Sequence, residues 1–319
     1  MSARGVWRAC GSTIGMLLLG MCTATVSFSK MLDLTGYQDD TGAITVQRGG
    51  DTVDPYFSLQ ALVLANAHGL DISAQASPWS QWLTKQYRTT GQLHRFCKQD
   101  HQWVACKPAD AEDASLALWL TFLNTVPTQK LQTPQLPRLQ KRVRTALQEL
   151  RDPQSGLYKV SRQIPHSLFM DNLEVWSAAP TRRHALAIQR VFWDADLEIY
   201  RVSTQADHPH PMAVFYPDAA AQLYPLLMKF PSIPSGASAF YKQWMAKHRR
   251  QWLSLMRTDF PWGLIALVAW EQGDLPTVIC WQLHALPLRH GMHWTVTDEV
   301  IAQILPPQPE SPMTPEDCT

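Results

Sequence analysis

Three carboxylates stand within four positions in the stretch Ala109-Asp-Ala-Glu-Asp-Ala-Ser-Leu-Ala-Leu-Trp-Leu120, and an almost wholly apolar run follows them. One carboxylate is enough to cap a helix N-terminus, and the mutual repulsion of three costs stability. Carboxylates gathered at a cavity can hold hydroxyl groups or exchange protons with a bound molecule. We therefore expect a binding or catalytic site at Asp110, Glu112 and Asp113.

Carboxylates and aromatic residues also stand at the start of other apolar segments. Asp54 comes directly before Pro55, and Asp171 lies within Phe169-Met-Asp-Asn-Leu-Glu-Val-Trp176. A single aspartate at such a position also fits a helix N-cap, with Pro at the first helical position. The residues expected to bind a ligand are Tyr56, Asp110, Glu112, Asp171, Asn172, Tyr216, Asp218 and Trp262.

The apolar segments alternate with amphipathic ones. Apolar helices are expected to begin near Asp54, Asp113, Ser167, Phe215 and Pro261. Amphipathic helices are expected at 79–87, capped by Ser77 with Pro78 at the first position, and at 139–150, 182–191 and 239–256. Short β-like pieces connect each amphipathic helix to the next apolar one. The period of about 45 to 57 residues is typical of an array of one repeated unit.

This alternation predicts an all-α fold. Helices that are apolar all round must be enclosed, whereas helices with one apolar stripe face solvent on their other side. We therefore expect an (α/α)6 toroid of five or six helical hairpins, in which an outer ring wraps an inner ring. The entrances to the inner helices would then surround the mouth of one central cavity.

Three of these entrances, at 54–64, 109–120 and 169–176, resemble those of six-hairpin glycosidases, most of all family-8 glycoside hydrolases, which include bacterial cellulases. In that family the first inner helix bears the general acid, and an Asp-x-Asp stretch opens the second. The architectural resemblance runs from Asp54 to Leu305 and implies cleavage of glycosidic bonds. Two positions differ: Val53-Asp-Pro55 replaces a Ser-Glu-Gly type stretch, and Ala111 replaces the first Asp of Asp-x-Asp.

Glycoside hydrolysis needs a carboxylic acid that protonates the leaving oxygen and a carboxylate that activates water or attacks directly. We expect Asp54 to be the acid and Asp113 the second carboxylate, while the ligand-binding residues hold sugar hydroxyls or stack on sugar rings. One alternative is a non-catalytic envelope protein that binds a polysaccharide in the same cavity. Another is a terpene-cyclase-like toroid, because DAEDA at 110–114 faintly resembles an Asp-x-Asp-Asp motif.

Composition narrows the choice of partner. A formal charge of +1 on 319 residues gives no electrostatic footprint for nucleic acid. The 13 Trp residues fit either sugar stacking or a helical core. No metal site is expected, because His and Cys residues lack paired ligand spacing, and His208 and His210 merely flank a proline. We expect a monomer that binds a carbohydrate polymer or oligosaccharide without a cofactor.

The N-terminus has the order of a secretory signal peptide. Arg4 and Arg8 precede the uncharged run Ile14–Cys22, and small residues follow. We expect residues 1–28 to direct export to the bacterial periplasm or medium, with an uncleaved membrane anchor as the alternative. A single domain is expected at 29–305, followed by a disordered Pro-rich tail at 306–319.

Export gives the cysteines a structural role. Cys97 and Cys106 flank a short polar loop. An oxidising compartment favours a disulfide between them over the alternative of two free thiols.

Overall fold

The computed structural model describes residues 30–132, 135–205, 214–308 and 313–318, and they are mostly helical. The predicted predominance of helices is therefore confirmed. No helix within these ranges is long and apolar enough to cross a lipid bilayer. The predicted signal segment at 1–28, together with His208 and His210, lies outside the described residues.

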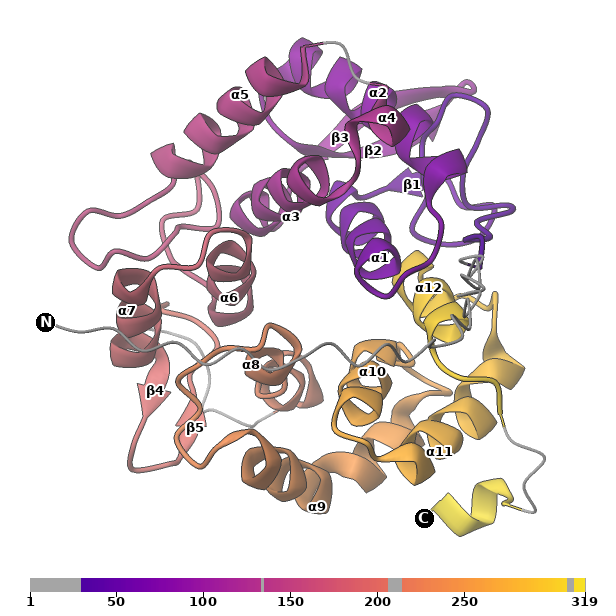
Figure 1. The fold of residues 1–319 in the computed structure, drawn as a ribbon, viewed down its shortest axis with the longest axis vertical. Helices are drawn as coiled ribbons and strands as arrows, with labels where there is room; N and C mark the ends of the chain where they lie inside the picture. The colour runs from indigo at the N-terminus through magenta and orange to yellow at the C-terminus, as the bar shows by residue number, and fades with distance from the viewer. Residues whose placement is uncertain (1–29, 133–134, 206–213, 309–312, 319) are drawn as a thin grey trace, which may run out of the picture.

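Six helices surround the centre of the molecule in Figure 1, and each contacts the next in chain order. The last of them contacts the first, so the sequence of contacts closes on itself. Helices in this position are surrounded by protein, which explains why segments such as Gly263–Glu271 are apolar on every side. The six are α1 (Pro55–Ala67), α3 (Glu112–Thr125), α6 (Phe169–Ala178), α8 (Tyr224–Leu227), α10 (Gly263–Glu271) and α12 (Val296–Ile304).

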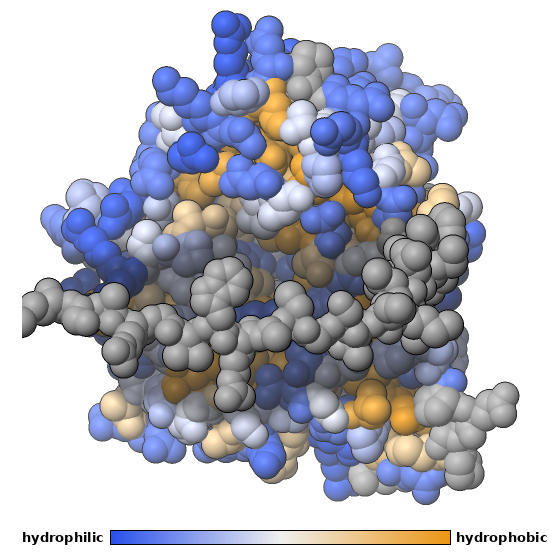
Figure 2. All heavy atoms as spheres, viewed as in Figure 1, coloured by the Kyte–Doolittle hydropathy of each residue, from blue (hydrophilic) through white to orange (hydrophobic). Residues whose placement is uncertain are grey.

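A second set of helices lies outside this inner set (Figure 1). Helix α5 packs on α3, α7 on α6, and α11 on α10. Helix α5 buries Leu139, Val143 and Leu147 and exposes its Arg and Lys residues, and hydrophilic side chains cover most of the rim in Figure 2. The outer helices are α2 (Ser73–Thr90), α5 (Leu136–Glu149), α7 (Arg182–Phe192), α9 (Ala237–Leu255) and α11 (Leu275–Ala285), with the short α4 (Thr128–Leu131) between α3 and α5.

Helix α2 begins earlier than predicted. The expected start at Ser77-Pro78 is wrong, because the helix starts at Ser73, whose backbone N–H donates to Asp71 Oδ1 at 3.1 Å. Pro78 therefore lies inside the helix, where it removes one backbone hydrogen bond. Burial of Trp79 and Trp82 on the same helix offsets that cost.

The same pair of hydrogen bonds, between a side-chain amide and one residue's backbone N–H and C=O groups, occurs at three places around the molecule. The Asn172 amide accepts from Tyr158 N at 2.8 Å and donates to Tyr158 O at 3.0 Å. The Gln222 amide binds the backbone of Tyr200 in the same way, at 2.8 and 2.9 Å. The Gln303 amide does so with Asp33, at 3.0 and 2.7 Å. Each amide thus holds an incoming segment against an inner helix or the turn before it. At α12 the segment held in this way is the one that contains Asp33.

The β-like connections form two small sheets. Strands β1 (Thr52–Val53), β2 (His94–Gln99) and β3 (Gln102–Pro108) make an antiparallel sheet, and β4 (Trp193–Asp194) pairs with β5 (Ile199–Tyr200). The predicted Cys97–Cys106 disulfide is confirmed and crosses the β2–β3 hairpin. In the sheet, Val53 pairs with Phe96, so Asp54 emerges beside Arg95.

The tail differs from its prediction. A second disulfide joins Cys280 of α11 to Cys318, which is buried within the 3-10 helix η3 (Pro315–Cys318). Arg249 of α9 also donates to the Cys318 carbonyl at 2.9 Å. The expectation of a wholly disordered tail therefore fails for residues 313–318, because Cys318 attaches them to the core.

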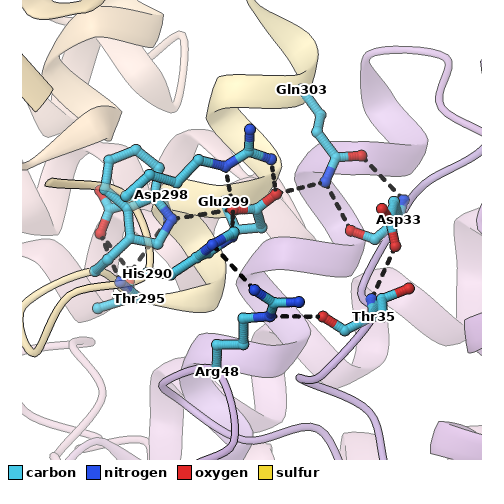
Figure 3. Close-up of polar contacts among 10 residues, drawn as sticks. Asp33, Thr35, Arg48, His290, Thr295, Asp298, Glu299 and Gln303 are labelled. Atoms are coloured by element: carbon cyan, nitrogen blue, oxygen red, sulfur yellow. Dashed lines mark hydrogen bonds and ion pairs between the residues drawn. The ribbon is translucent and has the colours of Figure 1, made fainter. Parts of the chain in front are cut away.

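A polar network joins the two ends of the chain where α12 meets the N-terminal segment (Figure 3). Glu299 is nearly fully buried and accepts hydrogen bonds from Arg289, from His290 Nε2 at 3.1 Å and from Gln303 Nε2 at 2.9 Å. His290 Nδ1 in turn lies 3.3 Å from Arg48 Nη1. The network links residues more than two hundred positions apart and holds α12 against the segment that precedes α1.

Candidate functional site at the helix entrances

A cavity of about 550 Å³ lies where the entrances to the inner helices meet. Residues at or before the N-termini of α1, α3, α6, α10 and α12 line it, and so do residues of α8 and of the turn η1 (Phe215–Ala219). Its polar and charged side chains come from Asp54, Gln60, Arg95, Asp110, Asp171, Asp259, Thr295, Thr297 and Asp298. The helices thus gather at one place side chains that are far apart in the sequence.

Asp171, on the first turn of α6, is the carboxyl of this wall with the most unusual surroundings. It is 4 % exposed, and its Oδ2 atom has no hydrogen-bond donor. Behind it lies Asp113, on the first turn of α3, which is 0 % exposed and has no donor for either oxygen. Helices α3 and α6 pack together, and the two carboxyls interact directly.

The surroundings of the two carboxyls favour the protonated form of both. Burial, together with the charge of Asp171, raises the pKa of Asp113 well above its usual range, and burial raises the pKa of Asp171 to about 7. A carboxyl pair inside a protein cannot hold two negative charges without a partner cation. The pair therefore keeps at least one proton at neutral pH, and that proton supplies the hydrogen bond that the unpaired oxygens lack.

Glu174, one turn further along α6, adds a third buried carboxyl. Its Oε1 atom accepts from Tyr56 Oη at 2.8 Å and from Gln60 Nε2 at 3.3 Å, whereas Oε2 has no donor. Burial and the charge of Asp171 raise the pKa of Glu174 well above its usual range. The described residues provide no Lys, Arg or His ion pair to this carboxyl or to the Asp113–Asp171 pair.

Asp54 lies on the same cavity wall but has different surroundings. Its Oδ2 atom accepts from Arg95 Nε at 3.2 Å and Nη2 at 2.9 Å, and its Oδ1 atom caps α1 at Tyr56 N, 3.1 Å away. Arg95 also bridges to Asp110 at 3.0 Å, and Lys107 pairs with the same carboxylate. Both oxygens of Asp54 are thus engaged, one in an ion pair with Arg95 and the other in the cap of α1.

The carboxylates of 110–113 point in three directions. Asp110 is half-exposed at the cavity rim, and Asp113 is buried behind Asp171. Glu112 is buried near Leu93 and Arg162 and does not line the cavity. The first turn of α3 therefore directs the Glu112 side chain away from this cavity. Asp113 likewise does not line the wall, although it contacts Asp171.

Two other expected ligand-binding residues have structural roles. The Asn172 side-chain amide accepts from Tyr158 N and donates to Tyr158 O and Leu168 O. His184 Nε2 lies 3.2 Å from its Oδ1 atom. Asp218 is 1 % exposed, and its Oδ2 atom accepts from Val214 N at 3.1 Å. Neither residue lines the cavity.

Aromatic rings cover another part of the wall. Tyr216 and Trp262 are stacked with ring centroids 4.7 Å apart, and Tyr216 is 49 % exposed. Tyr56, Phe57, Tyr224 and Phe260 line the cavity with them. The structure thus brings together six of the expected residues: Asp54, Tyr56, Asp110, Asp171, Tyr216 and Trp262.

Glu174 lies three positions after Asp171, at an entrance whose residues the sequence marks as functional candidates, and both side chains point to the same side of α6. Sequence reasoning missed other members of the site. Gln60 and Tyr224 lie inside apolar helices, where a buried polar residue is informative. Asp298 also lines the wall, but its oxygens are used by Thr295 and by Gly263 N in a capping box.

The described residues contain no group of three or more His, Cys, Asp or Glu side chains arranged to hold a metal ion. Three acidic residues of the DAEDA stretch therefore do not converge as the acidic motif of a terpene cyclase would need. In comparisons with known proteins, no family model, no curated protein and no solved structure matches this chain.

Proposed function

We propose that this chain is an exported glycoside hydrolase-like protein with the (α/α)6 toroid of the six-hairpin glycosidases. The observation that carries the proposal is a cavity whose wall combines Asp171, in contact with the buried Asp113, with the Arg95-paired carboxylate of Asp54 and stacked aromatic rings. The closed order of inner-helix contacts supports the toroid. Two disulfides support an oxidising compartment outside the cytoplasm.

The roles of the carboxyls follow from their surroundings. A general acid must hold a proton at working pH, and the buried pair of Asp171 and Asp113 does so. The base must be a carboxylate on the same wall, and Asp54, which pairs with Arg95 at 2.9 Å, is assigned that role. Asp54 is therefore assigned the role opposite to that expected from the sequence, and Asp171 takes the place of the acid.

The reaction that these roles allow is hydrolysis of a glycosidic bond. Asp171 donates its proton to the leaving oxygen as the bond between that oxygen and the anomeric carbon breaks. Water forms the new bond to the anomeric carbon, and Asp54 accepts its proton. Asp113 shares the remaining charge with Asp171, which keeps the donor protonated until substrate is bound.

The experiment is a test of reducing-sugar release from cellulose, xylan and mixed-linkage β-glucan. The wild-type protein is expected to cleave at least one polymer, and Asp171→Asn and Asp113→Asn are expected to lower the rate about 100-fold or more. Asp152→Asn, a change in an exposed turn, serves as the control and should leave the rate unchanged. Equal cleavage by wild type and Asp171→Asn would refute the assignment.

A second candidate is a non-catalytic polysaccharide-binding protein of the same shape. The ion pair between Arg95 and Asp54 favours this candidate. One oxygen of that carboxylate already binds Arg95, and the other caps α1. Wild-type protein that binds one of the polymers but releases no reducing ends would move the conclusion to this candidate.

A further inference from the structure

The part of the surface formed by α2 and α5 carries cations with few acidic residues. The sequence has no Asp or Glu within 72–99 or within 114–148, and these stretches contain α2, α4 and all of α5 except its last residue. The chain as a whole has a formal charge of only +1, so this part of its surface is far more basic than the average. The exposed cations of α5 are Arg138, Lys141, Arg142 and Arg144.

A groove of about 420 Å³ lies between the C-terminal end of α2 and the exposed side of α5. We call it the basic groove, and its cations are Arg138, Lys141, Arg142 and Arg162. Glu149 is the one acidic residue of the described chain that lines it, and Glu149 pairs with Arg162. Among the described residues no carboxylate forms an ion pair with the other three cations, so no neighbour neutralises their charge.

An aromatic ring holds Arg142 in an exposed position. The guanidinium carbon lies 5.1 Å from the centroid of the Tyr87 ring, and Tyr87 meets Trp119 edge-on at 5.1 Å. A guanidinium stacked on a ring keeps its N–H donors free in its own plane, where they can bind phosphate bidentately. Glu112 is buried near Arg162, but burial raises the pKa of Glu112 and so favours its neutral form. The basic groove therefore offers ordered donors whose positive charge is largely uncompensated.

We infer that the basic groove binds the phosphate groups of an anionic lipid surface. Clusters of Lys and Arg on one side of an amphipathic helix are typical of segments that bind anionic lipid headgroups, and α5 buries an apolar stripe on its other side. A surface that presents many phosphates can engage all the cations of the groove at once, which makes it a stronger ligand than one phosphate group in solution.

The same groove does not suit a protein partner. Protein interfaces depend on a few large apolar or aromatic anchors at their centre. Among the described residues, none of the large apolar side chains that are exposed lines the basic groove. Its attraction is therefore electrostatic and should weaken as the salt concentration rises.

The test is cosedimentation of the full chain with lipid vesicles at low ionic strength. Vesicles of equal parts phosphatidylglycerol and phosphatidylcholine are expected to bind the protein more tightly than vesicles of phosphatidylcholine alone. The double variant Arg138→Gln/Lys141→Gln should bind the mixed vesicles about 30-fold more weakly, because each Lys or Arg at an anionic surface adds to the affinity. Glutamine favours helices about as well as Arg and Lys do, so the fold of α5 is kept.

A matched control comes from the opposite side of the molecule. Lys242 and Lys247 are exposed on α9, which lies across the centre from α5 in Figure 1. Lys242→Gln/Lys247→Gln removes the same net charge and should leave the affinity for the mixed vesicles unchanged. Both double variants should keep the wild-type melting temperature.

Four results would overturn the inference. Equal binding of wild-type protein to both kinds of vesicle would remove it, and so would equal weakening by the two double variants, since net charge alone would then explain binding. Release by glycerol phosphate at the phosphate concentration of the vesicles would indicate a site for a single phosphate group. Equally tight binding to poly-glutamate would indicate an acidic protein partner. The basic groove does not line the central cavity, so each of these results would leave the proposed function standing.

Discussion

The carboxyls of Asp113, Asp171 and Glu174 lie in surroundings that are unfavourable to a charged group. Each is almost fully buried, and each keeps at least one oxygen without a donor from another residue. A buried carboxylate without a cation is strongly unfavourable, so these groups remain only because they hold protons. Such a cost is common at functional sites, where stability is lost for the sake of chemistry.

Removal of the Asp171 carboxyl should change how stability depends on pH. Its pKa is raised from 3.8 to about 7 in the folded protein. Between pH 4 and 7 the unfolded chain loses this proton and the folded chain keeps it, so the group lowers the free energy of unfolding as pH rises. Asp171→Asn should therefore gain stability relative to wild type across this range, by a few kcal/mol, measured by urea unfolding at each pH.

A matched control is available on the surface. The pKa of Asp152 is lowered, because Ser155 donates to its carboxylate. Its titration therefore falls below pH 4, and the stability difference between Asp152→Asn and wild type should stay constant between pH 4 and 7. If the stability difference from wild type changed with pH by the same amount for both variants, the raised pKa of Asp171 would be contradicted.

At the scale of elements, the two disulfides hold pieces that the core alone does not fix. The β2–β3 hairpin, closed by Cys97–Cys106, carries Arg95 to the cavity wall. The Cys280–Cys318 bond attaches the tail to α11. Both bonds stabilise the fold mainly by restricting the unfolded chain, and the effect grows with the length of the closed loop.

The longer loop should therefore contribute more. Sequence separations of 9 and 38 residues correspond to about 3 kcal/mol for Cys97–Cys106 and about 4 kcal/mol for Cys280–Cys318 in the chain-entropy account. Double Cys→Ser variants at each bond, compared by guanidinium unfolding, should show this order. A larger loss on removal of the hairpin disulfide would show that native packing of the hairpin, and not loop length, governs its contribution.

The elements were largely predictable and their fine positions were not. Apolar and amphipathic helices alternate in the sequence, and the starts of α3, α7 and α10 lie within two residues of the expected places. Local patterns could not show that α2 begins before Pro78. Burial of Trp79 outweighs the cost of a proline inside a helix there. Local patterns also could not show that Cys318 reaches Cys280, because no periodicity relates a tail to a distant helix.

At the scale of the whole molecule, the N-terminal segment around Asp33 and Arg48 meets α12 and the residues before it at a seam. Glu299 holds that seam through Arg289, His290 and Gln303 (Figure 3). Glu299→Gln should lower the free energy of unfolding by about 3 kcal/mol at neutral pH, because it leaves Arg289 without its buried partner. Hydrogen exchange should rise first at residues 30–50 and 289–304.

The effect of this variant should vanish in acid. Hydrogen bonds from Arg289 lower the pKa of Glu299 against the opposing effect of burial. A lowered carboxyl pKa gives stability that is present above the unfolded pKa and is lost as pH falls through the folded one. Wild type and Glu299→Gln should therefore converge in stability as pH falls toward 3. A difference that persists at pH 3 would mean that packing, and not charge, is what the variant loses.

The site as a whole could be predicted only in part. The sequence indicated that helix entrances carry carboxylates and rings, and Asp54, Asp171, Tyr216 and Trp262 do share one cavity. It could not indicate which carboxyl holds a proton, because that depends on whether a cation such as Arg95 lies beside it. Adjacent positions on one helical turn also point in different directions, which separates Glu112 from Asp113.

The central claim is that a glycan chain binds in the cavity with its cleaved bond at Asp171. A crystal structure of Asp171→Asn soaked with a cello-oligosaccharide of six glucose units tests it most directly. The account predicts a sugar ring in the cavity, a glycosidic oxygen within hydrogen-bond distance of residue 171, and a water or sugar atom against Asp54. An oligosaccharide bound elsewhere on the molecule, with the cavity unoccupied, would contradict it.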